Sequence, residues 1–149
     1  MVSLPSTGAV SIYQSSSPYS KMLLNKSKKR GIDGEIIAIE YLKSKGFLII
    51  KHNFYSRYGE IDIIATQNMI EIEGQEKQEV TVFVEVKNYQ DSNWLHPLEI
   101  ITKSKQKKLI KTAKYYILSH SSSFSTYRFD AIIIRNNNVT QHLENIMTV

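Results

Sequence analysis

Charged side chains interrupt two of the most apolar stretches of this sequence. Asp62 lies in the stretch 60–65, and Glu85 and Lys87 lie in the stretch 80–87, which is rich in the β-branched residues typical of strands. Successive side chains of a strand point to opposite faces, so Glu85 and Lys87 would share one face. In the stretch 60–65 one face would hold Glu60, Asp62 and Ile64, and the other Ile61, Ile63 and Ala65. Carboxylates among apolar residues are costly to ionise and repel one another, so this pattern indicates a compensating cation nearby.

A magnesium ion would compensate such acids and would also supply hydrolytic chemistry. Mg²⁺ prefers oxygen ligands, retains water and pairs with phosphate, and it can lower the pKa of a bound water. Asp62, Glu85 and Lys87 therefore fit a site for metal-assisted hydrolysis of a phosphodiester, with the lysine ammonium reaching the same phosphate or water. The alternative is a hairpin with a solvated polar stripe and a Glu–Lys pair at its edge. Spacing alone favours this alternative, because such short motifs often arise by chance.

The elements that would position these residues follow the order helix, three strands, helix, strand. Apolar spacing predicts the first helix over residues 33–45, with Gly46 at the position of a C-cap glycine. We predict strands over 47–50, 60–65, 80–87 and 127–134, a second helix over 98–119, a turn at 136–138, and a short closing strand or irregular segment over 139–146. Because strands that are apolar on both sides are usually covered on both faces, this order predicts an α/β fold with an αβββαβ core, a mixed central sheet flanked by helices.

Composition narrows the class of protein. The chain has 149 residues, of which 42% are hydrophobic, which suits one domain with a substantial core. It has no cysteine, which excludes disulfide scaffolds, thiol catalysis and cysteine-based zinc or iron–sulfur sites. No apolar run is long enough to span a bilayer, and the Ser-rich start lacks the order of charges of a secretory signal. We expect a cytoplasmic protein with no membrane partner.

The net charge of +5 is concentrated at the N-terminus. Residues 1–30 carry five basic side chains and no acidic one, whereas the remaining residues carry equal numbers of each. We therefore assign residues 1–30 to a flexible, basic, Ser-rich tail and residues 31–149 to one domain. Four lysines of the second predicted helix recur at helical spacing: Lys103, Lys107, Lys111 and Lys114. They form either a phosphate-binding patch or an ordinary solvated face.

Longer blocks of sequence give the chain a family resemblance. The matching residues include Gly34-Glu35, Asn53, the run 57–65 (Arg-Tyr-Gly-Glu-Ile-Asp-Ile-Ile-Ala), the run 82–87 (Val-Phe-Val-Glu-Val-Lys), Pro97-Leu98-Glu99, Lys105, Arg128-Phe129-Asp130 and His142-Leu143-Glu144-Asn145. With these residues the chain resembles the YraN-like family of predicted endonucleases, which is similar to the archaeal Holliday junction resolvases and to the restriction-endonuclease-like PD-(D/E)xK superfamily. The resemblance covers about residues 31–147, nearly everything except the tail.

The resemblance implies a role for each residue of the motif. Asp62 and Glu85 would bind Mg²⁺ or Mn²⁺ together with the Val86 carbonyl. Lys87 would orient the attacking water or stabilise charge on the phosphate, and Glu35 would contribute a ligand or a base.

The matching segment also supplies contacts to nucleic acid. Asn53 and Arg57 are the candidates there, beside the lysines of the second helix. Tyr55 and Tyr89 stand where members of this family often carry arginine, which removes two expected phosphate contacts. Arg128 and Asp130 would share a strand face and are expected to give structural support.

These residues predict a metal-dependent endonuclease acting on DNA, including branched or Holliday-junction DNA. A non-catalytic nucleic-acid-binding accessory module, using Lys87, the helical lysines and the tail, is the alternative. A weaker alternative is a protein adaptor that uses the acidic loop around Gly74. The likeness to resolvases also suggests a homodimer, because symmetric cutting of two strands needs paired sites.

Overall fold

The computed structural model describes residues 26–68, 79–89, 101–120 and 126–147 as two helices and five strands. In chain order the elements are α2 (Lys26–Ser44), β1 (Leu48–Ser56), β2 (Gly59–Asn68), β3 (Glu79–Tyr89), α3 (Lys103–His120), β4 (Thr126–Arg135) and β5 (Asn138–Leu143). The predicted helix-strand order is confirmed, and β5 is the short closing strand. Trp94, the acidic loop around Gly74 and residues 1–25 lie outside the described residues.

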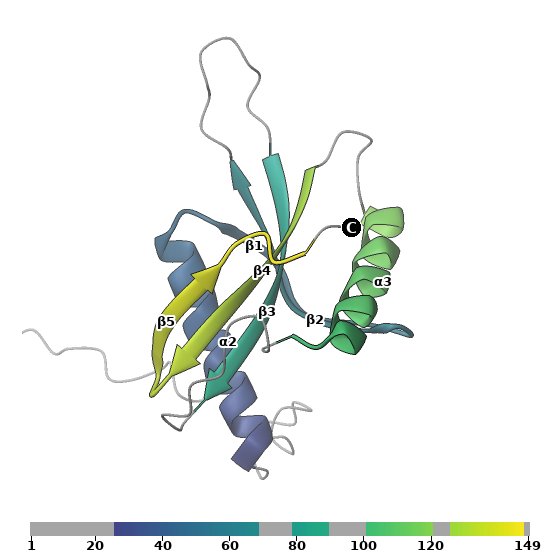
Figure 1. Cartoon of the computed structure of the whole chain (residues 1–149). Coiled ribbons are helices and arrows are strands. Elements are labelled where there is room, and N and C mark those ends of the chain that lie inside the picture. The colour runs from purple at the N-terminus through teal and green to yellow at the C-terminus, as the bar shows by residue number, and fades with distance from the viewer. Residues whose placement is uncertain (1–25, 69–78, 90–100, 121–125, 148–149) are drawn as a thin grey trace, which may run out of the picture.

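The five strands form one mixed sheet in the order β1-β2-β3-β4-β5 (Figure 1). Neighbouring strands are antiparallel except β3 and β4, which are parallel and pair from Val80 with Thr126 to Tyr89 with Arg135. A parallel pair needs a crossover connection, and α3 lies within it. The predicted α/β class and mixed central sheet are therefore confirmed.

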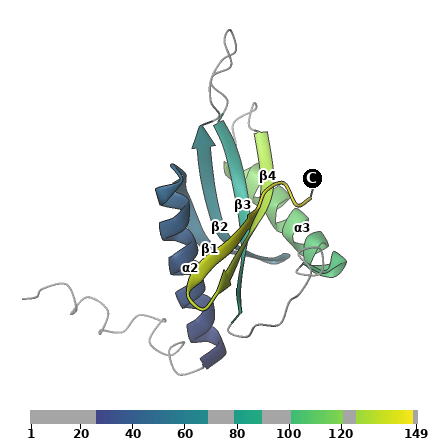
Figure 2. The ribbon, with the colours of Figure 1, turned by 60° about the vertical axis from the view of Figure 1, so that its left-hand side comes forward.

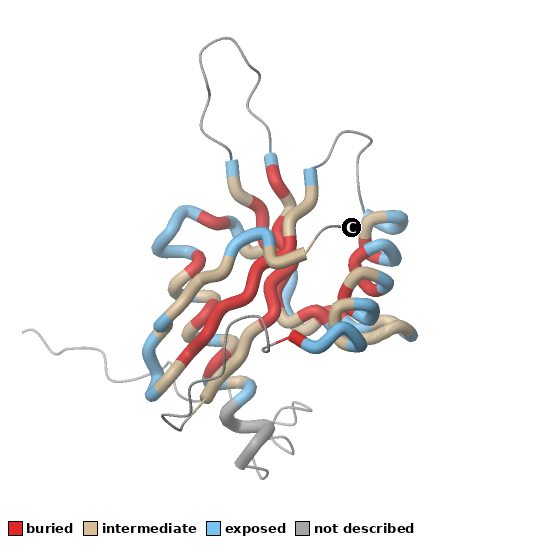
Figure 3. Tube along the Cα trace, in the orientation of Figure 1, coloured by how far each residue is buried: buried red, intermediate tan, exposed pale blue. Residues whose placement is uncertain are grey.

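The two helices cover opposite faces of this sheet, as Figure 2 shows. On the α3 face Leu109, Ala113 and Tyr116 pack with Phe83 and Phe129. On the α2 face Ala38 and Leu42 pack with valines and isoleucines of β3 and β4. The buried positions accordingly run along the middle of the sheet and the inner side of each helix (Figure 3). Near-continuous apolar runs in β2, β3 and β4 follow from this two-sided burial.

Helix boundaries differ from the sequence prediction at the N-terminal ends. α2 begins at Lys26 and so includes residues 26–30, which were assigned to the tail. Lysine and arginine are good helix formers but carry no apolar periodicity, so the pattern gave no sign of this turn. α3 begins at Lys103 rather than at residue 98, and Thr102 ends the preceding segment with its Oγ1 accepting the Lys105 N–H at 3.2 Å, as an N-cap does.

The predicted end of the first helix at Gly46 is confirmed. Gly46 has a φ of 85°, and the N–H of Phe47 donates to the carbonyl of Leu42 at 3.0 Å. A glycine is favoured here because other residues rarely adopt this left-handed conformation. The strand that follows extends to Ser56, beyond the predicted residue 50, because polar residues at its exposed edge hide its alternation.

β2 and β3 separate before either strand ends. Their last pair is Ile63 with Val84, after which residues 59–61 of β2 pair only with β1 and residues 85–89 of β3 pair with β4. We call this separation the β2–β3 fork. Beyond it β2 no longer keeps its predicted alternation, because Ile61 packs with Ile64 on the α3 face rather than with Ile63. Strands released from one neighbour can twist further, which explains the changed orientation.

None of the helices among the described residues is long and apolar enough to cross a membrane.

Candidate active site

A cleft of about 400 Å³ lies at the β2–β3 fork. The fork is at the end of the sheet where β3 ends and α3 begins, as the ribbon in Figure 1 shows. Its lining residues come from both sides of the sheet: Gly31 and Glu35 of α2, Glu60 and Asp62 of β2, Glu85, Val86, Lys87 and Asn88 of β3, and Lys105 of α3. An unbroken ladder between β2 and β3 would separate the two sides. The fork therefore lets both helices contribute to one cleft, which gathers four carboxyl groups and two amines.

Asp62 caps the exposed backbone at the fork. The Val86 N–H, which lies beyond the last pair between β2 and β3, donates to Asp62 Oδ2 at 2.7 Å. Burial raises the pKa of Asp62 to about 7, and the negative charges of Glu85 and Glu35 add to this effect, while the hydrogen bond from Val86 and the charge of Lys105 oppose it. The Asp62 carboxyl group therefore gains and loses its proton near neutral pH.

Glu85 is a buried carboxylate that is only partly satisfied. Its residue is 4% exposed. Its Oε1 accepts ion pairs from Lys87 Nζ at 2.9 Å and Lys105 Nζ at 3.3 Å. Its Oε2 is buried and has no hydrogen-bond partner among the described residues. Burial acts to lower the pKa of Lys87, but the charge and hydrogen bond of Glu85 outweigh it and raise that pKa, so Lys87 stays charged.

Glu35 reaches the cleft from α2 and is held by β1. The Asn53 side-chain amide donates to Glu35 Oε2 at 2.8 Å. Asn53 has a φ of 51°, a left-handed conformation that asparagine adopts more readily than most residues. Burial raises the pKa of Glu35, while the hydrogen bond from Asn53 partly counteracts it. Asn53, predicted from sequence as a contact to nucleic acid, positions this acid in the structure.

The acids of the cleft do not form a closed metal cage by themselves. Among the described residues no three histidine, cysteine, aspartate or glutamate side chains stand close enough to enclose an ion. The donor set still fits a hard divalent cation that retains much of its water, because Asp62 and the unpartnered Oε2 of Glu85 are oxygen donors lining one cleft. Such an ion would also compensate the crowding of negative charge that raises the Asp62 pKa.

Lys105 and Glu60 belong to the cleft, although neither residue was predicted from sequence to act in the site. Lys105 Nζ lies between Glu85 Oε1 and Glu60 Oε1, at 3.3 and 3.9 Å. One signal for Lys105 was present in the sequence. It stands off the stripe of four lysines defined above, and it is only partly exposed.

The predicted nucleic-acid contacts lie outside the cleft lining. Lys103, Lys107, Lys111 and Lys114 are all exposed on α3, as a phosphate-binding face requires. Arg57 lies in the exposed turn between β1 and β2, where its guanidinium stacks 4.8 Å from the centre of the Tyr58 ring and donates to the Tyr58 hydroxyl.

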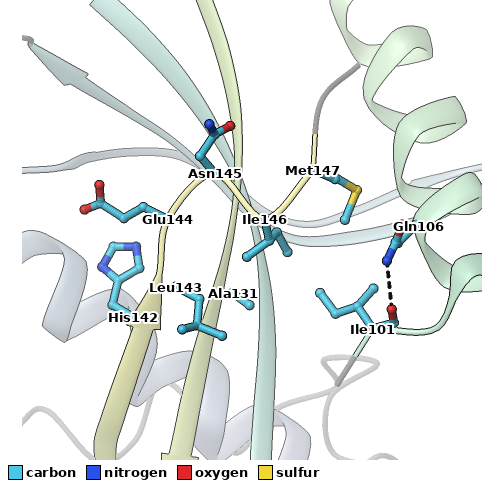
Figure 4. A pocket seen from close by; sticks show the side chains of 9 residues that line it. All are labelled: Ile101, Gln106, Ala131, His142, Leu143, Glu144, Asn145, Ile146 and Met147. Carbon is cyan, nitrogen blue, oxygen red and sulfur yellow. Dashed lines mark hydrogen bonds between the residues drawn. The ribbon is translucent and has the colours of Figure 1, made fainter. Parts of the chain in front are cut away.

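A second cavity, of about 420 Å³, lies between the start of α3 and the segment that follows β5 (Figure 4). Aliphatic side chains such as Ile101, Leu143 and Ile146 form much of its wall. The polar groups near it are engaged in structure. Asp130, 1% exposed, accepts hydrogen bonds from Arg128 and from the Asn145 N–H, and its Oδ2 lies 2.9 Å from His142 Nε2. This network joins β4 to β5, and within it Arg128 and Asp130 form an ion pair.

Comparison with known proteins finds one family that matches most of the chain. Residues 34–134 match the model of the uncharacterised protein family UPF0102. A UPF0102 protein of Persephonella marina is 40% identical over 116 residues, 78% of this chain and 90% of that protein. A UPF0102 protein of Helicobacter pylori is 39% identical over 126 residues, 85% of this chain and 97% of that protein. One from Psychromonas ingrahamii is 38% identical over 118 residues, 79% and 88% of the two chains.

Proposed function

This chain belongs to the uncharacterised protein family UPF0102, the YraN-like family that its sequence resembles, and we propose that it is a metal-dependent endonuclease that hydrolyses phosphodiester bonds in DNA. One observation carries the proposal. Glu85 is a buried carboxylate with one oxygen unpartnered, beside an aspartate whose pKa burial has raised to about 7. Incompletely satisfied acids in a cleft are costly to keep and are characteristic of sites that perform chemistry.

The acids are the ligands in this proposal. Asp62 and Glu85, with the Val86 carbonyl, would hold Mg²⁺ or Mn²⁺. When bound, the ion would supply Lewis-acid polarisation of the phosphodiester and a more acidic water. Asp62 is fixed in place for this role by the Val86 N–H. The likeness of the sequence to the PD-(D/E)xK superfamily supports the same assignment of residues.

The amines and the third acid act on the substrate. Lys87 and Lys105 both pair with Glu85, and these ion pairs position the two amines at the cleft. An entering phosphate would compete for both amines, and Lys87 would stabilise the negative charge that develops on the phosphate. Glu35, whose pKa is raised by burial, would accept a proton from the attacking water.

The exposed lysines of α3 would bind the DNA backbone. Lys103, Lys107, Lys111 and Lys114 are at helical spacing on the element that also supplies Lys105 to the cleft. Phosphates tracked along this face would therefore lead toward the acids.

A non-catalytic nucleic-acid-binding module remains the second candidate, for a specific reason. Both amines of the cleft already neutralise Glu85, and the described acids form no ready cage for a metal. A protein that uses the cleft only to hold phosphate would need Lys87 and Lys105 but no ion.

Cleavage of defined substrates separates the two candidates. Labelled four-way-junction, flap, linear duplex and single-stranded DNA would be incubated with Mg²⁺, Mn²⁺ or EDTA. We expect metal-dependent cutting that is lost in Lys87→Ala and Asp62→Asn. Lys45→Ala, at an exposed lysine away from the cleft, is the matched control for a lost amine and for contaminating nuclease.

The outcome decides between catalysis and binding alone. Cutting that persists equally in Lys87→Ala comes from another protein. If no substrate is cut and DNA binds equally well in EDTA, the accessory-module function replaces the endonuclease.

A further inference from the structure

A smaller hollow of about 290 Å³ adjoins the cleft. It is lined by Tyr55, Ser56, Gly59, Glu60, Lys105 and Lys108. Glu60 and Lys105 line the cleft as well, so the two spaces share a wall. Its volume is close to the lower end of the range of about 300–1,000 Å³ typical of small-ligand pockets. A group held in the hollow would therefore stand next to any group held at the acids.

We propose that this hollow is a subsite for one unpaired nucleotide of the DNA, adjacent to the phosphodiester held in the cleft, with the base against Tyr55 and a phosphate on Lys108. The inference rests on the proposed function and narrows its substrate to DNA with unpaired bases near the cut. The hollow is called the nucleotide subsite below.

Tyr55 supplies a surface for a base. The residue is 62% exposed although its ring is large and largely apolar. It is paired in the β-ladder with Glu60, which places the ring at the rim of the subsite rather than in the core. Bases stack on such aromatic rings regardless of sequence, because every base has a flat π face.

Lys108 supplies the positive charge. It is exposed on α3 one turn after Lys105, and within the described part of the chain no carboxylate lies at ion-pair distance from it. Lys105, by contrast, is already shared between Glu85 and Glu60. A phosphate entering the subsite would therefore meet one amine that needs no rearrangement to bind it.

The backbone around the subsite is fixed in place by close packing. Gly59 has a φ of 149°, and a Cβ there would lie 3.2 Å from Thr112 Oγ1 and 3.5 Å from the Lys108 Cβ. The Thr112 hydroxyl is itself tied to the Lys108 carbonyl at 2.9 Å. The start of β2 thus approaches α3 closely through a glycine, which holds strand and helix together around the hollow that Tyr55 and Lys108 line.

This arrangement selects against paired bases. In a duplex each base is stacked between its neighbours, so its face is not available to Tyr55. An unpaired base at a flap, a junction or a strand end can turn outward at little cost and stack on the ring. Lys108 alone would bind the phosphates of either form.

Binding in EDTA tests the subsite without any cutting. Single-stranded DNA with one 2-aminopurine and duplex DNA of the same length would be titrated with the wild type, Tyr55→Leu and Tyr55→Phe. Stacking on an aromatic ring contributes about tenfold in affinity per base, so Tyr55→Leu should bind single strands about tenfold more weakly and lose 2-aminopurine quenching. Tyr55→Phe keeps the ring and should behave as the wild type.

Duplex binding distinguishes stacking from charge. It should change less than twofold in Tyr55→Leu. Lys108→Gln should weaken both forms, whereas Lys45→Gln, an exposed lysine outside the subsite, should weaken neither. Equal loss of single-strand and duplex binding in Tyr55→Leu, or no loss of either, overturns the proposal. A melting curve checks that each variant folds.

Single-stranded RNA of the same sequence extends the test. If RNA and DNA bind with equal affinity, the subsite recognises the unpaired base and does not discriminate between the two sugars, which supports the proposal. Binding of RNA without DNA overturns it for the substrate named here. Failure of the endonuclease function is seen separately, because it would abolish cutting while the Tyr55-dependent binding in EDTA persists.

Discussion

Asp62 and Glu85 are neighbouring acids in unlike surroundings. Glu85 is paired with two amines, whereas Asp62 accepts one backbone N–H and has a pKa raised to about 7 by burial and by the nearby acids. Environments that separate the behaviour of two carboxyl groups are a usual way to assign them different roles. Here Glu85 is held by two amines, and Asp62 would take its charge when a cation binds beside it.

The pH dependence of stability should report the raised pKa of Asp62. Unfolded Asp62 loses its proton at about 3.8 and the folded residue at about 7, so between these values the native state binds more protons and stability falls as pH rises. Asp62→Asn removes this decline of stability with pH, and the asparagine side-chain oxygen can still accept the Val86 N–H. In EDTA above pH 7 the variant should be more stable than the wild type by about 1–3 kcal/mol.

Urea unfolding across this pH range measures the effect. The difference between Asp62→Asn and the wild type should vanish below pH 3.8, and Mg²⁺ should stabilise the wild type alone. Glu40→Gln, at an exposed acid of α2, is the control and should show no such trend. A pH-independent difference for Asp62→Asn would contradict the raised pKa.

Asn53 should act on catalysis only through Glu35. Asn53→Gly keeps the left-handed backbone but removes the hydrogen bond to Glu35 Oε2. We expect metal-dependent cleavage to fall roughly tenfold, as it should in Glu35→Gln, and the double variant to be no worse than Glu35→Gln. The pH profile of the cleavage rate should also move to higher pH in Asn53→Gly, because the hydrogen bond that lowers the Glu35 pKa is lost. Additive losses would show that Asn53 contacts substrate independently.

At the level of elements, α2 is fixed against β3 by a glycine. A Cβ on Gly34 would lie 2.8 Å from the Asn88 Cβ, closer than side chains approach one another, whereas a Cβ on Gly31 would meet nothing within 4 Å. The close contact brings the helix that supplies Glu35 against the strand that supplies Glu85 and Lys87. The position of the acid from α2 thus depends on one small residue.

Two alanine substitutions on this helix should have opposite effects. Gly34→Ala should lower the free energy of unfolding by about 1–3 kcal/mol, because the methyl group must displace Asn88. Gly31→Ala should raise it by roughly 0.5–1 kcal/mol, because alanine favours the helix and nothing stands in its way. Denaturant unfolding of the two variants measures both, and a similar effect from both would show that propensity alone decides.

The types of the elements were predictable from the sequence, whereas the contacts between elements were not. The β-branched run 80–87 and the C-cap at Gly46 gave β3 and the end of α2, because these signals are local. The β2–β3 fork depends on where one ladder stops, and nothing in the alternation of Ile61 and Ile63 marks it. The contacts of Lys105 in the cleft could not be predicted for the same reason. Its partners lie on β2 and β3, far from it along the chain.

For the molecule as a whole, the placement of charge matters more than the total of +5. Four lysines of α3 are exposed: Lys103, Lys107, Lys111 and Lys114. The same helix supplies Lys105 to a cleft that contains four carboxyl groups. Under the proposed function, a duplex would be attracted to the helix and repelled by the acids unless a cation is bound there. Charge on the helix should determine general affinity, and the cleft should determine where the backbone is held.

The salt dependence of duplex binding should measure the lysine face. Each phosphate contact contributes about 0.9 to the slope of log affinity against log salt, so Lys107→Gln with Lys111→Gln should reduce that slope by roughly 2. Lys43→Gln with Lys45→Gln removes the same charge at the end of α2, on the opposite face of the sheet, and should leave the slope unchanged. Equal effects in the two pairs would mean that binding follows net charge and not this face.

The parallel pairing of β3 with β4 also affects the order in which the sheet can assemble. β1, β2 and β3 can assemble as successive antiparallel neighbours while the chain is being synthesised, but β4 emerges only after α3 and cannot pair as a hairpin. Asp62 and Glu85 can therefore meet before Lys105 leaves the ribosome. Until then the nascent chain would hold its acids with one amine fewer, and a divalent ion would be the nearest substitute.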